Sequence, residues 1–108
     1  MDDEYWIPLP QFYDDGRESF PLWTRRYEFI QQARYKDSGE DMNRVLAAEL
    51  PTVLPLNLFI VWDNLPLEVQ SSYTETKKHL HEHLLLQQAV NHLTATVRDL
   101  NKDVTSLP

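Results

Sequence analysis

Three histidines stand close together at positions 79, 81 and 83, and a fourth lies at position 92. On a helix, His79 and His83 share one face, so they could hold one metal ion between them. A zinc site takes a third protein ligand, but Glu82 points away from this pair, and the sequence around His81 lacks the HExxH spacing. We therefore interpret the histidines as a solvated helix face, with pH sensing as an alternative. No metal or other cofactor is expected.

Asp37, Ser38 and Gly39 form the short signature of a retroviral-type aspartic protease, which is a homodimer of subunits near this length. Catalysis by a pair of carboxylates that share a proton needs a shielded site. Here the triplet lies among charged residues and joins two helical patterns. We interpret it as a turn in which Ser38 caps the next helix and Asp41 completes a capping box. No enzymatic activity is expected, and a protease subunit remains a remote alternative.

Composition limits the classes of function further. The 108 residues suit one domain, and the absence of cysteine excludes disulfides and thiolate metal sites. That absence fits a reducing interior, so we predict a cytoplasmic location. A formal charge of −7 disfavours direct nucleic-acid binding, and no apolar run approaches the roughly 20 residues of a membrane span. The two glycines argue against an all-β fold and a glycine-rich phosphate loop.

The most apolar run of the chain, residues 55–66, is the segment around which we expect the others to pack. Pro55 suits the first turn of a helix, and Pro66 disfavours its continuation. A buried strand fits the local pattern almost as well, but helical patterns on both sides favour a helix. Because almost no polar face remains, this helix is predicted to be buried all round, as a central post.

Residues 1–17 are predicted to form an extended arm, because Pro8 and Pro10 oppose helix and residues 14–16 indicate a turn. Its apolar side chains are too many for a free tail: Tyr5, Trp6, Ile7, Leu9, Phe12 and Tyr13. We expect the arm to lie on the body with Phe12 as its anchor. A polyproline-type ligand for another protein is the alternative interpretation.

Residues 18–85 are predicted to form a helical lobe. Ser19 can cap a helix that runs to about Lys36, and a second helix spans about 40–50 before Pro51. Ser72 can start a long helix. Apolar residues fall on one face of the first helix at steps of three and four: Phe20, Trp23, Tyr27, Ile30 and Ala33. The face of the last helix that is turned toward the body carries Tyr73, Leu80 and Leu84.

Residues 86–108 follow a heptad pattern in which steps of four and three alternate. The members are Leu86, Val90, Leu93, Val97, Leu100, Val104 and Leu107, with valine at a and leucine at d. A β-branched residue at a with leucine at d favours two parallel strands. This pattern predicts a homodimer formed through the C-terminal helix; a helix folded back on its own domain is the alternative.

The order of these motifs resembles the N-terminal capsid lobe of Gag from LTR retrotransposons, the lineage that also gave the neuronal Arc protein. Four motifs carry the resemblance over about residues 10–85. They are Trp23, Arg26, Tyr27 and Ile30; Leu50-Pro51; Phe59, Trp62 and Leu65; and Tyr73, Lys77 and Leu80. The chain would then be a fragment of a longer polyprotein or the product of a domesticated retroelement. No zinc knuckle follows, and the heptad tail stands where a second lobe would begin.

The resemblance implies an all-α structural protein, not an enzyme, whose lobes assemble into shells. It also implies an apolar groove in which the Arc lobe binds short peptides. The groove and core residues would be Phe12, Trp23, Tyr27, Phe59, Trp62 and Tyr73. We therefore predict a bundle of about five helices with an N-terminal arm and a long C-terminal helix that self-associates. The alternative is an adaptor for short proline- and aromatic-containing peptides.

Overall fold

The computed structural model describes the backbone of residues 8–105 and the side chains of residues 8–101. All regular structure in this range is helical, which confirms the predicted all-α class. The elements are α1 (Phe20–Arg34), α2 (Met42–Glu49), the 3₁₀ helix η2 (Leu50–Val53), α3 (Leu56–Asp63), α4 (Leu67–Gln70) and α5 (Tyr73–Thr105). Tyr5, Trp6, Ile7 and Leu107 lie outside the described residues, and Val104 is described only by its backbone.

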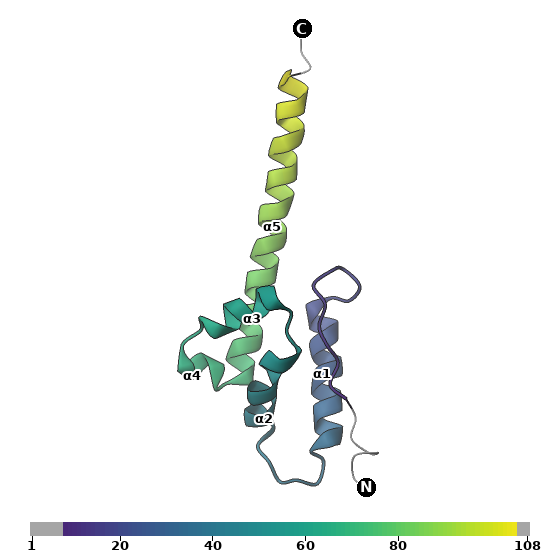
Figure 1. The fold of residues 1–108 in the computed structure, drawn as a ribbon, viewed down its shortest axis with the longest axis vertical. Helices are drawn as coiled ribbons and strands as arrows, with labels where there is room; N and C mark the ends of the chain where they lie inside the picture. Colours follow the sequence, from purple (N-terminus) through teal and green to yellow (C-terminus); the bar gives the residue numbers. More distant parts are fainter. Residues whose placement is uncertain (1–7, 106–108) are drawn as a thin grey trace.

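Helix α5 belongs to the body at one end only. Its first turns pack against α2, α3 and α4, and its remaining length rises away from the body as a single helix (Figure 1). The molecule is therefore 73 Å long, with a radius of gyration of 18.7 Å. A compact chain of this length has a radius of gyration of about 13 Å. The helix continues without interruption through the predicted boundary at residue 86, and its buried side chains end at Leu84.

Helix α1 starts as predicted, because the Ser19 hydroxyl accepts a hydrogen bond from the amide of Leu22 (3.3 Å) and a proline stands in its first turn. The predicted continuation of its buried face is wrong: Ile30 is half-buried and Ala33 is exposed. A 3.6-residue period carries the face to Gln31, whose amide is hydrogen-bonded inside the body. The buried residues of α1 are Phe20, Trp23, Thr24, Tyr27 and Gln31.

The cap of helix α2 differs from the prediction. Asp41 itself is the N-cap, and its carboxylate accepts from the amide of Asn43 (3.1 Å), so α2 begins two residues later than expected. Ser38 instead closes the preceding turn, where its hydroxyl donates to the carbonyl of Tyr35 and accepts from the amide of Glu40. Gly39 has a φ of +74°, a conformation that glycine adopts readily and that delays the helix.

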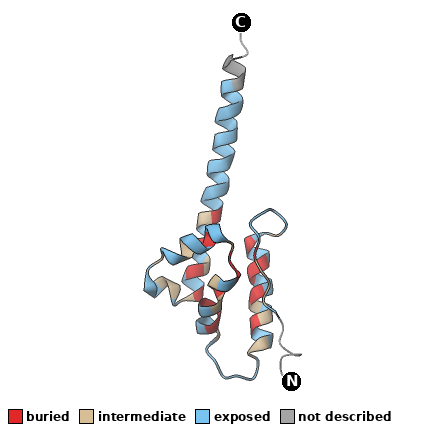
Figure 2. Ribbon diagram, in the orientation of Figure 1, coloured by how far each residue is buried: buried red, intermediate tan, exposed pale blue. Residues whose placement is uncertain are grey.

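Residues 56–63 form helix α3, as favoured over the strand alternative, but α3 is not a central post. Leu58 is the one fully buried side chain of α3. Leu56 and Ile60 are 75% and 52% exposed, so α3 lies at the edge of the body (Figure 2). The core lies instead where the arm, α1, α2, η2 and the start of α5 meet, and α3 contributes one side of it.

The described part of the arm, residues 8–14, is extended and lies along α1 (Figure 1). Phe12 is 2% exposed, and its amide donates to the carbonyl of Val53 (2.9 Å). The side chain of Gln11 donates to the same carbonyl (3.0 Å), and the indole of Trp23 donates to the carbonyl of Pro10 (3.0 Å). The arm therefore satisfies its backbone groups through the body, with Phe12 as the expected anchor.

Candidate functional site

A stripe of exposed apolar side chains runs along the free part of α5. We call the five described members the α5 stripe: Leu86, Val90, Leu93, Val97 and Leu100. Each is 54–66% exposed although all are valine or leucine, and the whole surface of this part of the helix is exposed (Figure 2). Repeats at steps of four and three place all five on one face of the helix. The structure thus leaves this face without a partner among the described residues.

A shallow hollow marks the middle of the α5 stripe. It has a volume of about 290 Å³ and is lined by Val90, Leu93, Thr94 and Val97. In the heptad register these are positions a, d, e and the following a. Four such neighbours form the hole that receives one side chain of the facing helix in a coiled coil. The α5 stripe therefore presents both the protruding side chains and the holes of a coiled-coil seam.

The predicted groove and core residues fall into two groups. Phe12, Trp23, Tyr27 and Tyr73 are all buried and form one chain of rings. The ring centroids are 5.3 Å apart for Phe12 and Trp23, 5.2 Å for Trp23 and Tyr27, and 6.0 Å for Tyr27 and Tyr73. These spacings are typical of packed aromatic side chains. Phe12 of the arm packs against Trp23 of α1, one of the residues that the resemblance placed in a peptide groove.

Phe59 and Trp62 stand apart from this chain of rings. Phe59 is 38% exposed and lies outside the buried cluster that contains Phe12. Its ring contacts that of Trp62, with centroids 5.5 Å apart, and Trp62 is half-buried against the core. Both lie on α3, whose inward side chain is Leu58. The rotation of α3 about its own axis therefore decides which of its apolar residues enters the core.

Glu49 is the centre of a polar network that the sequence did not indicate. Its carboxylate accepts hydrogen bonds from the side chains of Gln31 (3.0 Å), Arg34 (3.1 Å) and the Tyr35 hydroxyl. The hydroxyl of Tyr27 donates to the carbonyl of Leu46 (2.8 Å) beside it. Burial acts to raise the pKa of Glu49, but the hydrogen bonds and the charge of Arg34 outweigh it and hold the pKa below its ordinary value.

Replacing Glu49 with glutamine is expected to lower the free energy of unfolding at pH 7 by about 1–3 kcal/mol, because it removes charge-assisted hydrogen bonds inside the body. A carboxyl group whose pKa is depressed by folding stabilises the protein above its unfolded pKa, and that contribution is lost as the pH falls through the folded pKa. The difference between wild type and variant should therefore shrink below pH 4.5, the ordinary pKa. Urea unfolding at fixed protein concentration over a pH series measures it.

The matched control for this network is Glu82→Gln, because Glu82 is exposed on α5. Its stability should follow that of wild type at every pH. A constant difference between wild type and the Glu49 variant from neutral to acidic pH would contradict the role given to this carboxylate.

The residues that suggested catalysis and metal binding are not assembled into a site. Asp37 is exposed in a turn between helices α1 and α2, where a retroviral-type protease would have strands. Among the described side chains, residues 8–101, no three histidine, aspartate or glutamate residues converge in a way that could hold a metal ion. His81 alone approaches the core, with its ring centroid 6.1 Å from that of Phe20.

Comparisons with protein-family models, with curated proteins and with solved structures give no match. The resemblance to a Gag capsid lobe therefore stays a prediction. Among the described helices, none combines the length and the apolar character that crossing a membrane requires.

Proposed function

We propose that this protein is a structural self-association module in which two copies pair through α5 as a parallel two-stranded coiled coil. The single observation that carries the proposal is the α5 stripe, a line of exposed valine and leucine side chains on a helix that leaves its own body. Paired in this way, two helical lobes would stand at one end of a shared rod.

The free part of α5 needs such a partner for its own stability. From residue 85 to residue 101 every side chain is exposed, so no tertiary packing offsets the conformational entropy that is lost when a helix forms. Most helical stability in proteins comes from packing of an apolar face, and the free part of α5 has no such packing within the described chain. Burial of the α5 stripe against a second helix supplies that packing.

The side chains of the stripe favour a second copy in a parallel arrangement. Valine at a and leucine at d is the combination that favours parallel dimers. The hollow in the stripe is bounded by the residues that would surround Leu93 of a second copy in parallel register. The e and g positions among the described side chains are uncharged: Gln87, Ala89, Thr94, Thr96 and Asn101. Two identical helices therefore meet without like-charge repulsion along the described part of the seam, although the next g residue, Asp103, is charged and these positions supply little pairing specificity.

Disulfide trapping tests both the pairing and its direction, because the chain has no cysteine of its own. In a parallel dimer each d residue faces its own copy, so Leu100→Cys should form an intermolecular disulfide under mild oxidation. The control is Ala95→Cys, which occupies the outer f position and should remain uncrosslinked. Equal crosslinking of both variants, or none at Leu100→Cys under conditions where the chain is dimeric, would contradict a parallel pair.

The resemblance to Gag capsid lobes is compatible with this role, since self-assembly is what that family does, and we keep a Gag-like capsid lobe as the specific form of the proposal. An intracellular location likewise remains a prediction from the absence of cysteine. The alternative adaptor, which would bind a proline- and aromatic-containing peptide, has less support. Phe12 and Pro10 of the arm already occupy the position beside Trp23 that such a peptide would take.

A further inference from the structure

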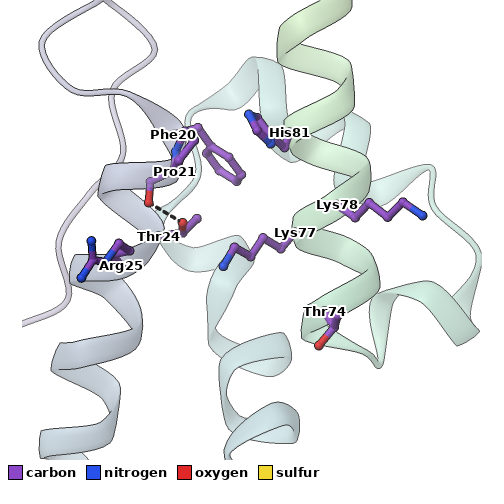
Figure 3. Close-up of a pocket in the computed structure, with 8 residues that line it drawn as sticks. All are labelled: Phe20, Pro21, Thr24, Arg25, Thr74, Lys77, Lys78 and His81. Atoms are coloured by element: carbon purple, nitrogen blue, oxygen red, sulfur yellow. Dashed lines mark hydrogen bonds between the residues drawn. The ribbon is translucent and has the colours of Figure 1, made fainter.

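A second feature of the body is a groove between α1 and α5, with a volume of about 540 Å³ (Figure 3). The rings of Phe20 and His81 are in contact at its upper end, with centroids 6.1 Å apart and ring planes tilted by 34°. Thr24, which is fully buried, forms part of its floor. Its hydroxyl is satisfied by the carbonyl of Pro21 (2.9 Å), so the floor offers mainly apolar contact to a ligand.

The lower end of the groove is closed by an ion-pair cluster that joins the two helices. The carboxylate of Glu28 on α1 accepts from the ammonium of Lys77 and from the hydroxyl of Tyr73 on α5, both at 2.7 Å. Lys77 points from α5 toward α1 (Figure 3), and its ammonium neutralises the Glu28 carboxylate. This cluster fixes the spacing of α1 and α5 without α5 having to pack closely on α1.

Two further cations flank the groove, one on each helix. Arg25 on α1 and Lys78 on α5 line it and extend outward on opposite sides (Figure 3). Neither forms an ion pair within the described residues, although the chain carries a net charge of −7. They place one cation at each side of the groove, on a molecule whose net charge is negative. A ligand that suits this surface carries negative charge on both sides of an apolar group.

We propose that this groove binds an extended acidic segment of a partner protein, with a large apolar side chain laid against Pro21 and the ring of His81. Carboxylates on either side of that side chain would pair with Arg25 and Lys78. Charge complementarity carries the choice of an acidic peptide, and apolar contact with Pro21 and the His81 ring gives the segment a fixed position. The groove does not include residues of the α5 stripe, so peptide binding can be tested independently of dimer formation.

The probe for this proposal is a fluorescein-labelled peptide with the sequence Ser-Glu-Glu-Phe-Glu-Glu-Ser, titrated with the intact chain and followed by fluorescence anisotropy. We expect saturable binding that weakens as salt is added, because exposed charge pairs are screened. A peptide with serine in place of phenylalanine should bind at least about tenfold more weakly, since burial of a phenylalanine side chain contributes strongly to affinity. Equal binding of the two peptides would overturn the apolar part of the site.

The double variant Arg25→Glu with Lys78→Glu should weaken binding of the phenylalanine peptide by about tenfold or more, because like charges then face its carboxylates. Arg25→Gln with Lys78→Gln should give a smaller loss in the same direction. The charge-matched control is Lys36→Glu with Arg44→Glu, two exposed positions away from the groove, and it should bind within about twofold of wild type. Equal losses in the groove and control variants, or no binding by wild type, would overturn the proposal.

A shortened chain that starts at Pro8 tests an internal occupant, because residues 2–6 read Asp-Asp-Glu-Tyr-Trp and have similar chemistry. The proposal predicts that this chain binds the probe as the intact chain does. Binding that is more than about tenfold tighter after the deletion would show that the chain's own N-terminus holds the groove, and would overturn an external partner.

Discussion

Val97→Asp is expected to convert the dimer into a monomer while the helical body stays folded. Val97 is one of the two a residues of the α5 stripe and is 54% exposed in the single chain. In a parallel pair the substitution places two carboxylates opposite each other inside an apolar seam. Uncompensated charge in such a place costs about 3 kcal/mol or more, which corresponds to about 100-fold or more in the dissociation constant. Sedimentation equilibrium measures the change.

The matched control is Ala95→Asp, which puts the same charge on the outer face of the same helix and should remain dimeric. Circular dichroism should show a partial loss of helix in Val97→Asp, because the free part of α5 loses its partner. Thermal unfolding of the body should change little, since the buried side chains of α5 end at Leu84. A fully dimeric Val97→Asp chain would contradict the seam.

Phe12→Ala is expected to lower the free energy of unfolding by about 3–5 kcal/mol, the usual cost of removing a buried phenylalanine ring. Phe12 is 2% exposed and packs against Phe20 and Trp23, with ring centroids 5.4 Å and 5.3 Å away. Its loss opens a cavity at one end of the chain of rings and weakens the hold of the arm on the body. Urea denaturation followed by tryptophan fluorescence measures the effect.

Tyr13→Ala is the neighbouring control, because Tyr13 is on the same arm and 48% exposed. Its ring contacts the guanidinium of Arg17, which lies 4.3 Å from the ring centroid. We therefore expect the free energy of unfolding to fall by at most about 1 kcal/mol. Comparable losses for the two variants would show that the arm is not anchored through Phe12.

Local signals in the sequence located most of the helices. Ser19 with a following proline marked the start of α1, and Ser72, whose hydroxyl accepts from the amide of Glu75, marked the start of α5. These features act within one turn of chain, so they can be recognised without tertiary information. The choice between Ser38 and Asp41 as the cap of α2 failed because both residue types cap helices and only the conformation at Gly39 separates them.

The orientation of α3 could not be obtained in the same way. Its sequence is apolar on all faces, which indicates burial but does not say which face meets the core. The body is small, so it covers one side of α3, and Leu58 enters the core while Leu56 and Ile60 remain outside. The burial of Gln31 has a similar cause, because its partner Glu49 is 18 residues away in the sequence.

The cationic groove depends on pairings between distant residues. In the sequence Arg25 and Arg26 lie close to two acidic residues and form only a small basic patch. In the fold Glu18 binds Arg26 (2.7 Å) and Glu28 binds Lys77 (2.7 Å). Arg25 and Lys78 are left without an ion pair among the described residues, on opposite sides of the groove. The α5 stripe, by contrast, could be predicted from Leu86 to Leu100, because a heptad is a local repeat in the sequence.

The mass of the intact chain in solution tests self-association most directly. Multi-angle light scattering over a concentration series should approach about 25.6 kDa, twice the 12.8 kDa of one chain. A chain that ends at Leu85 should retain the mass of a monomer at every concentration. A mass of 12.8 kDa for the intact chain at its highest soluble concentration would contradict pairing through α5.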